Sequence, residues 1–210
     1  MRPSRVRRRP LLRFEGWIAG MGTSSGTRIV LGHWCRSPFG PFSDVMLEKA
    51  DGERLLLAPT RETADFVGAT YTFDAVRVVP VEVSSAAGAW TVTAGPLDLC
   101  FTTGRRGLLG MLLCAVPGPL ARRPAWSALT DRFAGLLLPG VRTRGSTIGG
   151  RREWYGARDL RPIPALSATF EGTDLGPVAA VEPPVRFGFS SVPREPALTR
   201  VTTLIALGPE

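Results

Sequence analysis

The sequence predicts a mainly β protein, an antiparallel β-sandwich or open barrel of about ten strands with a helical insertion near residues 105–138. Three observations predict this fold class. Short runs of branched and aromatic residues recur along the chain between turn residues. The 24 glycines and 19 prolines exceed the share usual in globular proteins, which favours many turns. Residues 44–59 have the pattern of a buried β-hairpin.

The hairpin of residues 44–59 can turn in two registers. A two-residue loop sets Lys49 against Arg54, and directly opposed like charges are destabilising. A three-residue loop with Gly52 in the left-handed conformation instead sets Lys49 against Glu53, so we predict this register. It divides the apolar residues between two faces, with Val45, Leu47, Leu55 and Leu57 on one and Met46 and Leu56 on the other.

Two strands are expected before the hairpin, over residues 14–19 and 27–34. A short helix is expected after it, with Thr60 as the N-cap, Glu62 in the first turn and an end near Gly68. Strands should follow over residues 71–83, 90–94 and 97–102. Pro80 indicates an edge or a bulge in the first of these strands.

Residues 105–116 are apolar on nearly all sides, which predicts a buried helix of about three turns. A second helix should begin near Pro124 and end at Pro139-Gly140, completing the insertion. Further strands are expected over residues 141–146, 153–160, 163–170 and 198–206. The proline-rich residues 172–196 should form a long connection.

Residues 1–13 contain six arginines and no acid, so we expect a basic, flexible N-terminal arm before a single β-rich domain of residues 14–210. The net charge is +8, and without the six arginines of this arm only +2 remains. The arm lacks interleaved aromatic residues, so no specific nucleic-acid readout is predicted. A membrane-surface or nucleic-acid contact through the arm stays open as a second alternative function.

The three cysteines show no disulfide framework spacing, and no secretory signal or apolar span of about 20 residues is present. We therefore expect a soluble cytoplasmic protein. His33 is the only histidine, and neither it nor the cysteines have paired ligand spacing, so no metal site and no cofactor are predicted. Cys35 should share a strand face with His33, where packing against a buried thiol is favoured over a catalytic pair.

Two further patterns resemble catalytic motifs. Gly22-Thr23-Ser24-Ser25-Gly26 has the spacing of a nucleophile elbow, but a strand rather than a helix should follow it, which favours a hairpin turn. Lys49 is the only lysine and could supply a Schiff-base amine, but its expected place opposite Glu53 favours a solvated ammonium.

Aromatic residues on the predicted strands supply the candidate binding site. Four tryptophans fall on strands, more than a plain core needs, and could line a cavity for an apolar or aromatic ligand. The candidate ligand-binding residues are Trp17, Trp34, Trp90, Arg152 and Trp154. If the same scaffold is an enzyme, a lyase, cyclase or isomerase, the candidate catalytic residues are Glu15, Asp44, Glu153 and Tyr155.

Four segments resemble an uncharacterised protein family from high-GC bacteria that has no known activity. The segments are Arg13-Phe14-Glu15-Gly16-Trp17, the run from Pro38 to Met46, Arg151-Arg152-Glu153-Trp154-Tyr155 and the run from Pro183 to Phe189. Phe14-Glu15-Gly16-Trp17 is also similar to a segment of the lipocalin-like tocopherol cyclase group, in which an aromatic residue usually follows the tryptophan. Here Ile18 follows it.

The function that these observations favour is binding of an apolar or aromatic small molecule in an internal pocket. A protein with strand-borne tryptophans and no complete catalytic constellation is better suited to binding than to catalysis. The enzyme reading is the first alternative, and oligomeric state is left open by the sequence.

Overall fold

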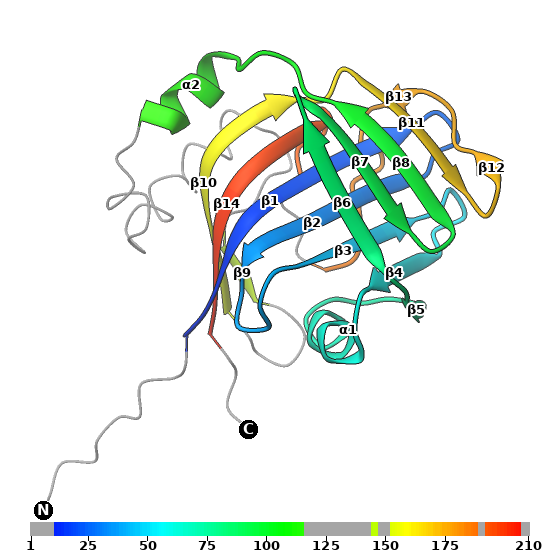
Figure 1. The fold of residues 1–210 in the computed structure, drawn as a ribbon, viewed down its shortest axis with the longest axis horizontal. Coiled ribbons are helices and arrows are strands. Elements are labelled where there is room, and N and C mark those ends of the chain that lie inside the picture. Colours follow the sequence, from blue (N-terminus) through cyan, green and yellow to red (C-terminus); the bar gives the residue numbers. More distant parts are fainter. Residues whose placement is uncertain (1–10, 116–143, 147–151, 189–191, 207–210) are drawn as a thin grey trace, which may run out of the picture.

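Two packed β-sheets make up the computed structural model, which describes residues 11–115, 144–146, 152–188 and 192–206 (Figure 1). The large sheet has the strand order β5 (Ala75–Val78), β4 (Arg54–Ala58), β3 (Phe42–Glu48), β2 (Arg28–Arg36), β1 (Leu11–Thr23), β14 (Ala197–Ala206), β10 (Arg152–Pro162), β9 (Arg144–Ser146). A short strand outside this order, β13 (Val178–Ala179), also pairs with β1. The small sheet has the order β12 (Thr173–Asp174), β11 (Ala165–Phe170), β8 (Leu97–Thr102), β7 (Ala89–Ala94), β6 (Val81–Ala86). The predicted sheet-based fold class is confirmed, and among the described pairs only β4 and β5 run parallel.

The hairpin of β3 and β4 has the predicted register. Val45 lies opposite Leu57, and Glu48 lies opposite Arg54. The Lys49 amide donates to the Glu53 carbonyl at 2.9 Å, and Gly52 has a φ of +94°. Gly52 therefore takes the left-handed conformation that a side chain would disfavour, and opposite charges face one another across the turn.

The inner face of the large sheet packs on the small sheet. Alternate residues of the strands on both sides form one continuous buried cluster, as a period of two requires. From the large sheet it contains Ala19, Met21, Ile29, Leu31, Val45, Leu47, Leu55, Leu57 and Leu198. From the small sheet it contains Trp90, Val92, Ala94, Leu97, Leu99, Phe101, Ala168 and Phe170. Residues between these positions on β7 and β8 are exposed, so the small sheet has one wet face.

The outer face of the large sheet is also apolar and is covered by a different layer. We call this layer the cover: α1 (Arg61–Gly68), residues 70–73, residues 180–188 and Val192. Val30, Met46, Leu56 and Ala58 of the sheet pack against it. From the cover, the contacts come from Ala64, Phe66, Val67, Tyr71, Phe73, Val181, Val185, Phe187 and Val192. The second apolar face of the hairpin, Met46 and Leu56, is thus buried by chain from two distant parts of the sequence.

Helix α1 begins where the sequence predicts. Thr60 is the N-cap: its hydroxyl accepts from the Thr63 amide, and the Thr63 hydroxyl accepts from the Thr60 amide. Glu62 lies in the first turn, next to the positive end of the helix dipole. The reciprocal cap fixes the direction of a helix of only eight residues, which carries one wall of the cavity described below.

Two predicted boundaries are wrong. Residues 71–83 do not form one strand: β5 ends at Val78 and β6 begins at Val81, because the chain leaves the large sheet at Val79-Pro80 and enters the small one. The first strand also begins earlier than predicted, at Leu11 rather than Phe14, because Leu11 of β1 still pairs with Ala206 of β14. Residues 1–10 lie outside the described residues.

The predicted helical insertion is described only at its start, by α2 (Leu108–Ala115), and the predicted second helix lies outside the described residues. The burial expected for α2 is wrong. Leu108 is 72% exposed and Leu112 is 57% exposed, and Gly110 is the buried residue of the helix. Arg106 and Asp159 hold this region to β10 through two hydrogen bonds, of 2.8 and 2.9 Å. The apolar composition of this segment therefore predicts the helix correctly but does not predict its exposure.

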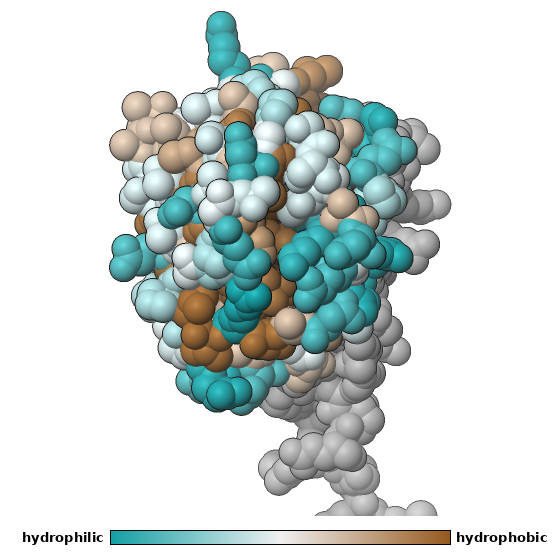
Figure 2. All heavy atoms as spheres, turned by 90° about the vertical axis from the view of Figure 1, so that its right-hand side faces the viewer, coloured by the Kyte–Doolittle hydropathy of each residue, from teal (hydrophilic) through white to brown (hydrophobic). Residues whose placement is uncertain are grey.

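Edge strand β5 carries two exposed valines, Val76 and Val78. Figure 2, which faces the side of the molecule where β5 lies, shows hydrophobic surface exposed between hydrophilic groups. Neither α1 nor α2 has the length and apolar character needed to cross a bilayer, a statement that applies to the described part of the chain.

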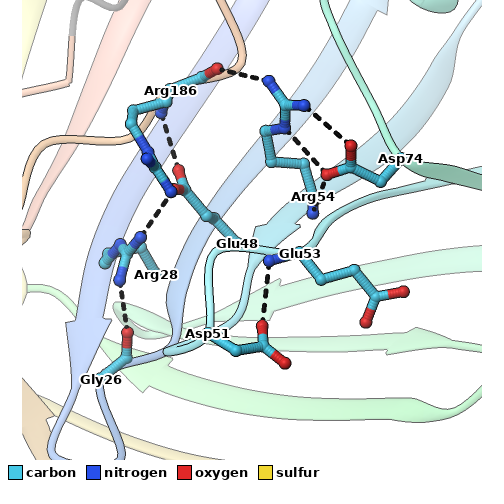
Figure 3. A network of polar contacts seen from close by, with 8 residues as sticks. All are labelled: Gly26, Arg28, Glu48, Asp51, Glu53, Arg54, Asp74 and Arg186. Carbon is cyan, nitrogen blue, oxygen red and sulfur yellow. Dashed lines mark hydrogen bonds and ion pairs between the residues drawn. The ribbon is translucent and has the colours of Figure 1, made fainter.

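Glu48 is the buried centre of a charge network that fastens residues 180–188 to the sheet (Figure 3). Its carboxylate is fully buried and meets the Arg28 guanidinium at 2.8 Å. Arg186 donates to it twice, from the backbone amide at 2.7 Å and from Nε at 2.8 Å. Arg54, which pairs with Asp74, also donates to the Arg186 carbonyl at 3.4 Å. The network joins β2, β3 and β4 to a segment about 138 residues later in the chain.

Glu48→Gln should destabilise the protein strongly. Replacing the carboxylate leaves Arg28 buried without its counter-charge, which typically costs about 3–5 kcal/mol. The matched control is Glu53→Gln, which removes the exposed Lys49 pair and should cost less than about 1 kcal/mol. Urea unfolding of both variants measures the difference, and equal losses of stability would contradict the role assigned to Glu48.

Candidate functional site

A cavity lies between the outer face of the large sheet and the cover. Its volume is about 70 Å³. A buried water needs roughly 10–15 Å³ on the same measure, so the space suits a small organic group. The lining is mostly apolar and aromatic: Phe14, Ile18, Val30, Gly32, Trp34, Phe42, Asp44, Met46, Phe66, Val67, Thr70, Tyr71, Val185, Phe187, Gly188, Val192, Thr203 and Ile205.

Asp44 is the one carboxyl among the described lining residues. It lies on β3, two residues from Met46 and four from Glu48, so the pleat directs all three to the outer face. Only 3% of the residue is exposed. Burial raises the pKa of this carboxyl to about 7, although a hydrogen bond from Trp34 opposes the rise. A buried acid that titrates near neutral pH is a common feature of functional sites.

Trp34 orients Asp44. Its indole Nε1 donates to Asp44 Oδ1 at 3.1 Å, across the β2–β3 pair in which Trp34 lies opposite Phe42 and Gly32 lies opposite Asp44. Gly32 makes room for this contact, because a Cβ there would lie 2.6 Å from Asp44 Oδ1 and 2.8 Å from Trp34 Nε1. The absence of a side chain at position 32 is therefore a requirement of the Asp44–Trp34 pair.

Aromatic rings form the cavity wall nearest Asp44. Phe14 of β1 packs edge-on against Trp34 with the ring centres 5.6 Å apart, and stacks on Phe66 of α1 at 5.4 Å. Phe42 approaches Phe14 edge-on at 6.5 Å. Edge-to-face and stacked contacts of this kind are favourable beyond the area that they bury. The cluster joins three strands to α1 and keeps the wall rigid.

Thr203 adds a polar group to the lining from β14. The residue is 3% exposed, and its hydroxyl has no hydrogen-bond partner among the described residues. A buried hydroxyl without a partner costs about 1–3 kcal/mol. Asp44 likewise has one hydrogen-bond partner among the described side chains, Trp34. Two strands of the large sheet, β3 and β14, therefore present polar atoms with unused hydrogen-bonding capacity to the cavity.

The structure divides the predicted ligand-binding tryptophans between the two faces of the large sheet. Trp34 lines the cavity on the outer face. Trp17 and Trp90 lie on the inner face, where their rings meet edge-on at 6.1 Å and Trp90 stacks on Phe101 at 5.8 Å. Trp17 and Trp90 therefore do not line this cavity, and they pack with the core side chains between the two sheets.

Of the other predicted site residues, Glu15 does not belong to the described cavity lining, and the remaining four can be placed only by their backbone. Glu15 forms ion pairs with Arg13 and Arg36 away from it, the second at 3.9 Å. The backbones of Arg152, Glu153, Trp154 and Tyr155 belong to β10, paired with β14, but their side chains lie outside what the structure describes. Their predicted roles stay predictions.

His33 faces the inner side of the sheet, away from the cavity. Its Nδ1 shares a hydrogen bond of 2.8 Å with the Ser43 hydroxyl, and its ring meets Trp90 edge-on at 5.7 Å. Burial lowers its pKa. Cys35, Cys100 and Cys114 are exposed and free. No group of three histidine, cysteine or acidic side chains is close enough to hold a metal within the described parts of the chain.

The remaining sequence motifs are structural. Gly22 and Thr23 end β1, Ser24 to Gly26 form the turn, and the strand β2 follows as expected, so the elbow geometry is absent there. Lys49 pairs with Glu53 at 2.6 Å and lies 5.6 Å from the centre of the Phe170 ring. The hydrogen bond to Glu53 raises the Lys49 pKa, whereas a Schiff-base amine needs a lowered one.

Comparison with known proteins leaves the family open. The chain matches no known family model and no curated protein, so the resemblance to a high-GC bacterial family stays a prediction. Similar solved structures include an acetoacetate decarboxylase from Legionella pneumophila subsp. pneumophila strain Philadelphia 1, with 11% identity, a TM-score of 0.42 and coverage of 95% of this chain and 86% of that one. A second, from structural studies of acetoacetate decarboxylase, has 10% identity, a TM-score of 0.44 and coverage of 95% and 88%. Likeness this low carries no argument about this chain.

Sequence reasoning missed most of the cavity wall. It named Trp34 and Asp44, but assigned them to different roles and did not place them in contact. Phe66, Tyr71, Phe187 and Thr203 were not named, because they come from four separate segments that the cover and β14 bring together. One available signal was the alternation along β3, which sets Asp44 on the same face as the apolar Met46.

Asp44→Asn should stabilise the protein in a pH-dependent way. The unfolded carboxyl titrates near 3.8 and the folded one near 7, so the folded state holds an extra proton between these values and wild-type stability falls as pH rises through them. Asn carries no such charge, and still accepts from Trp34. At pH 8 the variant should be more stable by at most roughly 4 kcal/mol, and near pH 4 the two should be alike.

Urea unfolding from pH 4 to pH 8 measures this difference. The control is Asp74→Asn, because the Arg54 hydrogen bonds lower the Asp74 pKa to about 2. Asp74 is therefore ionised in the folded protein throughout this range, and in the unfolded protein at pH values well above 3.8. The stability of the Asp74→Asn variant relative to wild type should show no comparable trend between pH 5 and pH 8. A pH-independent gap between wild type and Asp44→Asn would contradict the assigned titration.

Proposed function

We propose that this protein binds a small, largely apolar molecule in the cavity beneath the cover, with Asp44 as its main polar contact. One observation carries the proposal: a mostly apolar and aromatic cavity holds a buried carboxyl that is oriented by an indole. Binding sites for small molecules commonly combine an apolar lining with a few fixed polar groups.

The polar groups argue against a simple packing void. Voids left by imperfect packing are lined by apolar atoms, because a buried polar atom without a partner is costly. Here Asp44 faces an aromatic wall, and the Thr203 hydroxyl lacks a partner among the described residues. A ligand that satisfies these groups would recover part of that cost, which gives the site an affinity for polar substituents at defined positions.

The construction of the cover also suits a binding site. Residues 180–188 are held at one end by the Glu48–Arg186 contacts, and α1 is fixed by its own cap and by the Phe14–Phe66 stack. Both walls are thus preorganised without a ligand. Preorganised walls lose little conformational freedom on binding, which favours affinity.

A second candidate function is catalysis at the same carboxyl. An acid whose pKa lies near 7 can donate and accept a proton at neutral pH, which is what a general acid–base needs. The reaction classes in view are those of a lyase, cyclase or isomerase. Of the four acids and phenols named from the sequence, Asp44 is the one that the described structure brings to the cavity.

Tryptophan fluorescence tests the binding proposal. A panel of small branched and aromatic alcohols, amines and acids should contain compounds that change the emission of the wild-type protein, because Trp34 lines the cavity. Trp34→Phe should remove that response. Trp17→Phe, the matched control on the inner face, should retain it. A response that depends on Trp17 and not on Trp34 would place the ligand elsewhere, and no response to any compound would count against binding.

Paired acid variants test the catalytic candidate. If metabolite screening finds a turnover, Asp44→Asn should lower its rate by about 100-fold or more, the usual contribution of a general acid–base. Glu15→Gln should leave the rate unchanged, because Glu15 pairs with Arg13 and Arg36 away from the cavity. A turnover that survives Asp44→Asn at the wild-type rate would reject Asp44 as the acid–base.

A further inference from the structure

The described lining of the cavity has an acidic side chain and no basic one. Among the described lining residues Asp44 is the one carboxyl, ionised at mildly basic pH, and there is no lysine, arginine or histidine. Within the described lining, the other side chain with an ionisable group is the Tyr71 phenol, and His33, the strand neighbour of Trp34, faces the opposite side of the sheet. The buried Arg28 and the exposed Arg186 are both paired with Glu48.

This arrangement selects against negative ligands. An anion in the cavity would lie beside a second buried carboxyl, where the low local polarity makes like-charge repulsion strong. A purely apolar ligand would remove water from Asp44 without forming a hydrogen bond to the carboxyl in its place. A cation with an N–H group satisfies the carboxyl by charge and by hydrogen bond together, and charge-assisted hydrogen bonds are the stronger kind.

The aromatic wall favours the same sign of charge. Phe14, Trp34, Phe42 and Phe66 line the same cavity as Asp44 and pack against one another, and the faces of such rings attract cations. The combination of several rings with one carboxylate is the usual chemistry for holding an ammonium group in a pocket. The protein uses a related contact elsewhere, where the Arg200 guanidinium lies 5.7 Å from the centre of the Trp17 ring.

We propose that the ligand is a small primary or secondary amine, bound as its ammonium ion with an N–H group donating to the Asp44 carboxylate and its hydrocarbon part against the aromatic wall. This inference rests on the proposed binding function and specifies its ligand class. The Thr203 hydroxyl, which lines the cavity from β14 of the same sheet, is available to a second polar group of the ligand.

Binding of an ammonium ion requires ionised Asp44, which makes the affinity depend on pH in a defined direction. The pKa of the free carboxyl is about 7, so it is mostly protonated at pH 6 and mostly ionised at pH 8. Affinity should therefore rise about tenfold from pH 6 to pH 8. Alkylamines stay protonated over this range, as lysine does, so the rise reports Asp44 rather than the ligand.

Cavity size restricts the probe. A cavity of about 150 Å³ holds benzene, and this one has about half that volume, so a branched four-carbon chain is a suitable test body. Isobutylamine, isobutanol and isobutyrate share that skeleton and differ in the polar group: a cation, a neutral donor and an anion. Their comparison at equal concentration separates the effect of charge from that of shape.

The experiment follows the Trp34 indole N–H by nitrogen-edited NMR, with its resonance assigned from Trp34→Phe, while each compound is titrated at pH 6 and pH 8. At pH 8 isobutylamine should bind at least tenfold more tightly than isobutanol, and isobutyrate should bind more weakly than both. Asp44→Asn should reduce isobutylamine to the level of isobutanol. Asp98→Asn, which removes an exposed acid of the small sheet, should have no effect.

Each result has a distinct meaning. Equal affinity for amine and alcohol, or no pH dependence of amine binding, would overturn the amine inference and leave the binding function standing. Failure of all three compounds together with the whole fluorescence panel would overturn the binding function itself. The pH series on the wild-type protein requires no substitution, so the inference can be refuted even if Asp44→Asn does not fold.

Discussion

The large sheet has apolar residues on both faces, and the rest of the structure follows from the need to bury both. A sheet with one apolar face needs one covering layer, whereas this one needs two. The small sheet covers the inner face with side chains that alternate in step with those opposite, and the described contact is filled. The outer face is covered by a short helix and irregular segments, which cannot match a pleated surface as closely. The cavity lies in that less regular layer.

Two buried acids on the outer face of β3 show how differently the same group can be treated. Glu48 is neutralised by Arg28 and Arg186 and serves to fasten the cover. Asp44, four residues earlier on the same face, has one indole donor and an aromatic surround, and its pKa rises to about 7. A carboxyl that is paired contributes to the fold, while one left without a counter-charge remains available to a ligand. This contrast is the physical basis of the function that we propose.

The cover connects stability with the site. Residues 180–188 contribute Val185 and Phe187 to the cavity wall and Arg186 to the charge network, so one segment both lines the cavity and is held by Glu48. Because its side chains alternate between these two tasks, loosening the network would also displace the wall. The site is thus supported by contacts outside it, as preorganised binding sites generally require.

The sequence by itself determined the local structure. The alternation of β3 and β4, the charges beside Gly52 and the cap at Thr60 fixed the hairpin register and the start of α1, because neighbours in the chain decide these features. It also named Asp44 and Trp34. The tertiary structure alone decided that these two meet, that Trp17 and Trp90 face the other way, and that the Val79-Pro80 step changes sheets. Those outcomes depend on which distant segment covers each face, and a period-two pattern shows that a face is buried without showing what buries it.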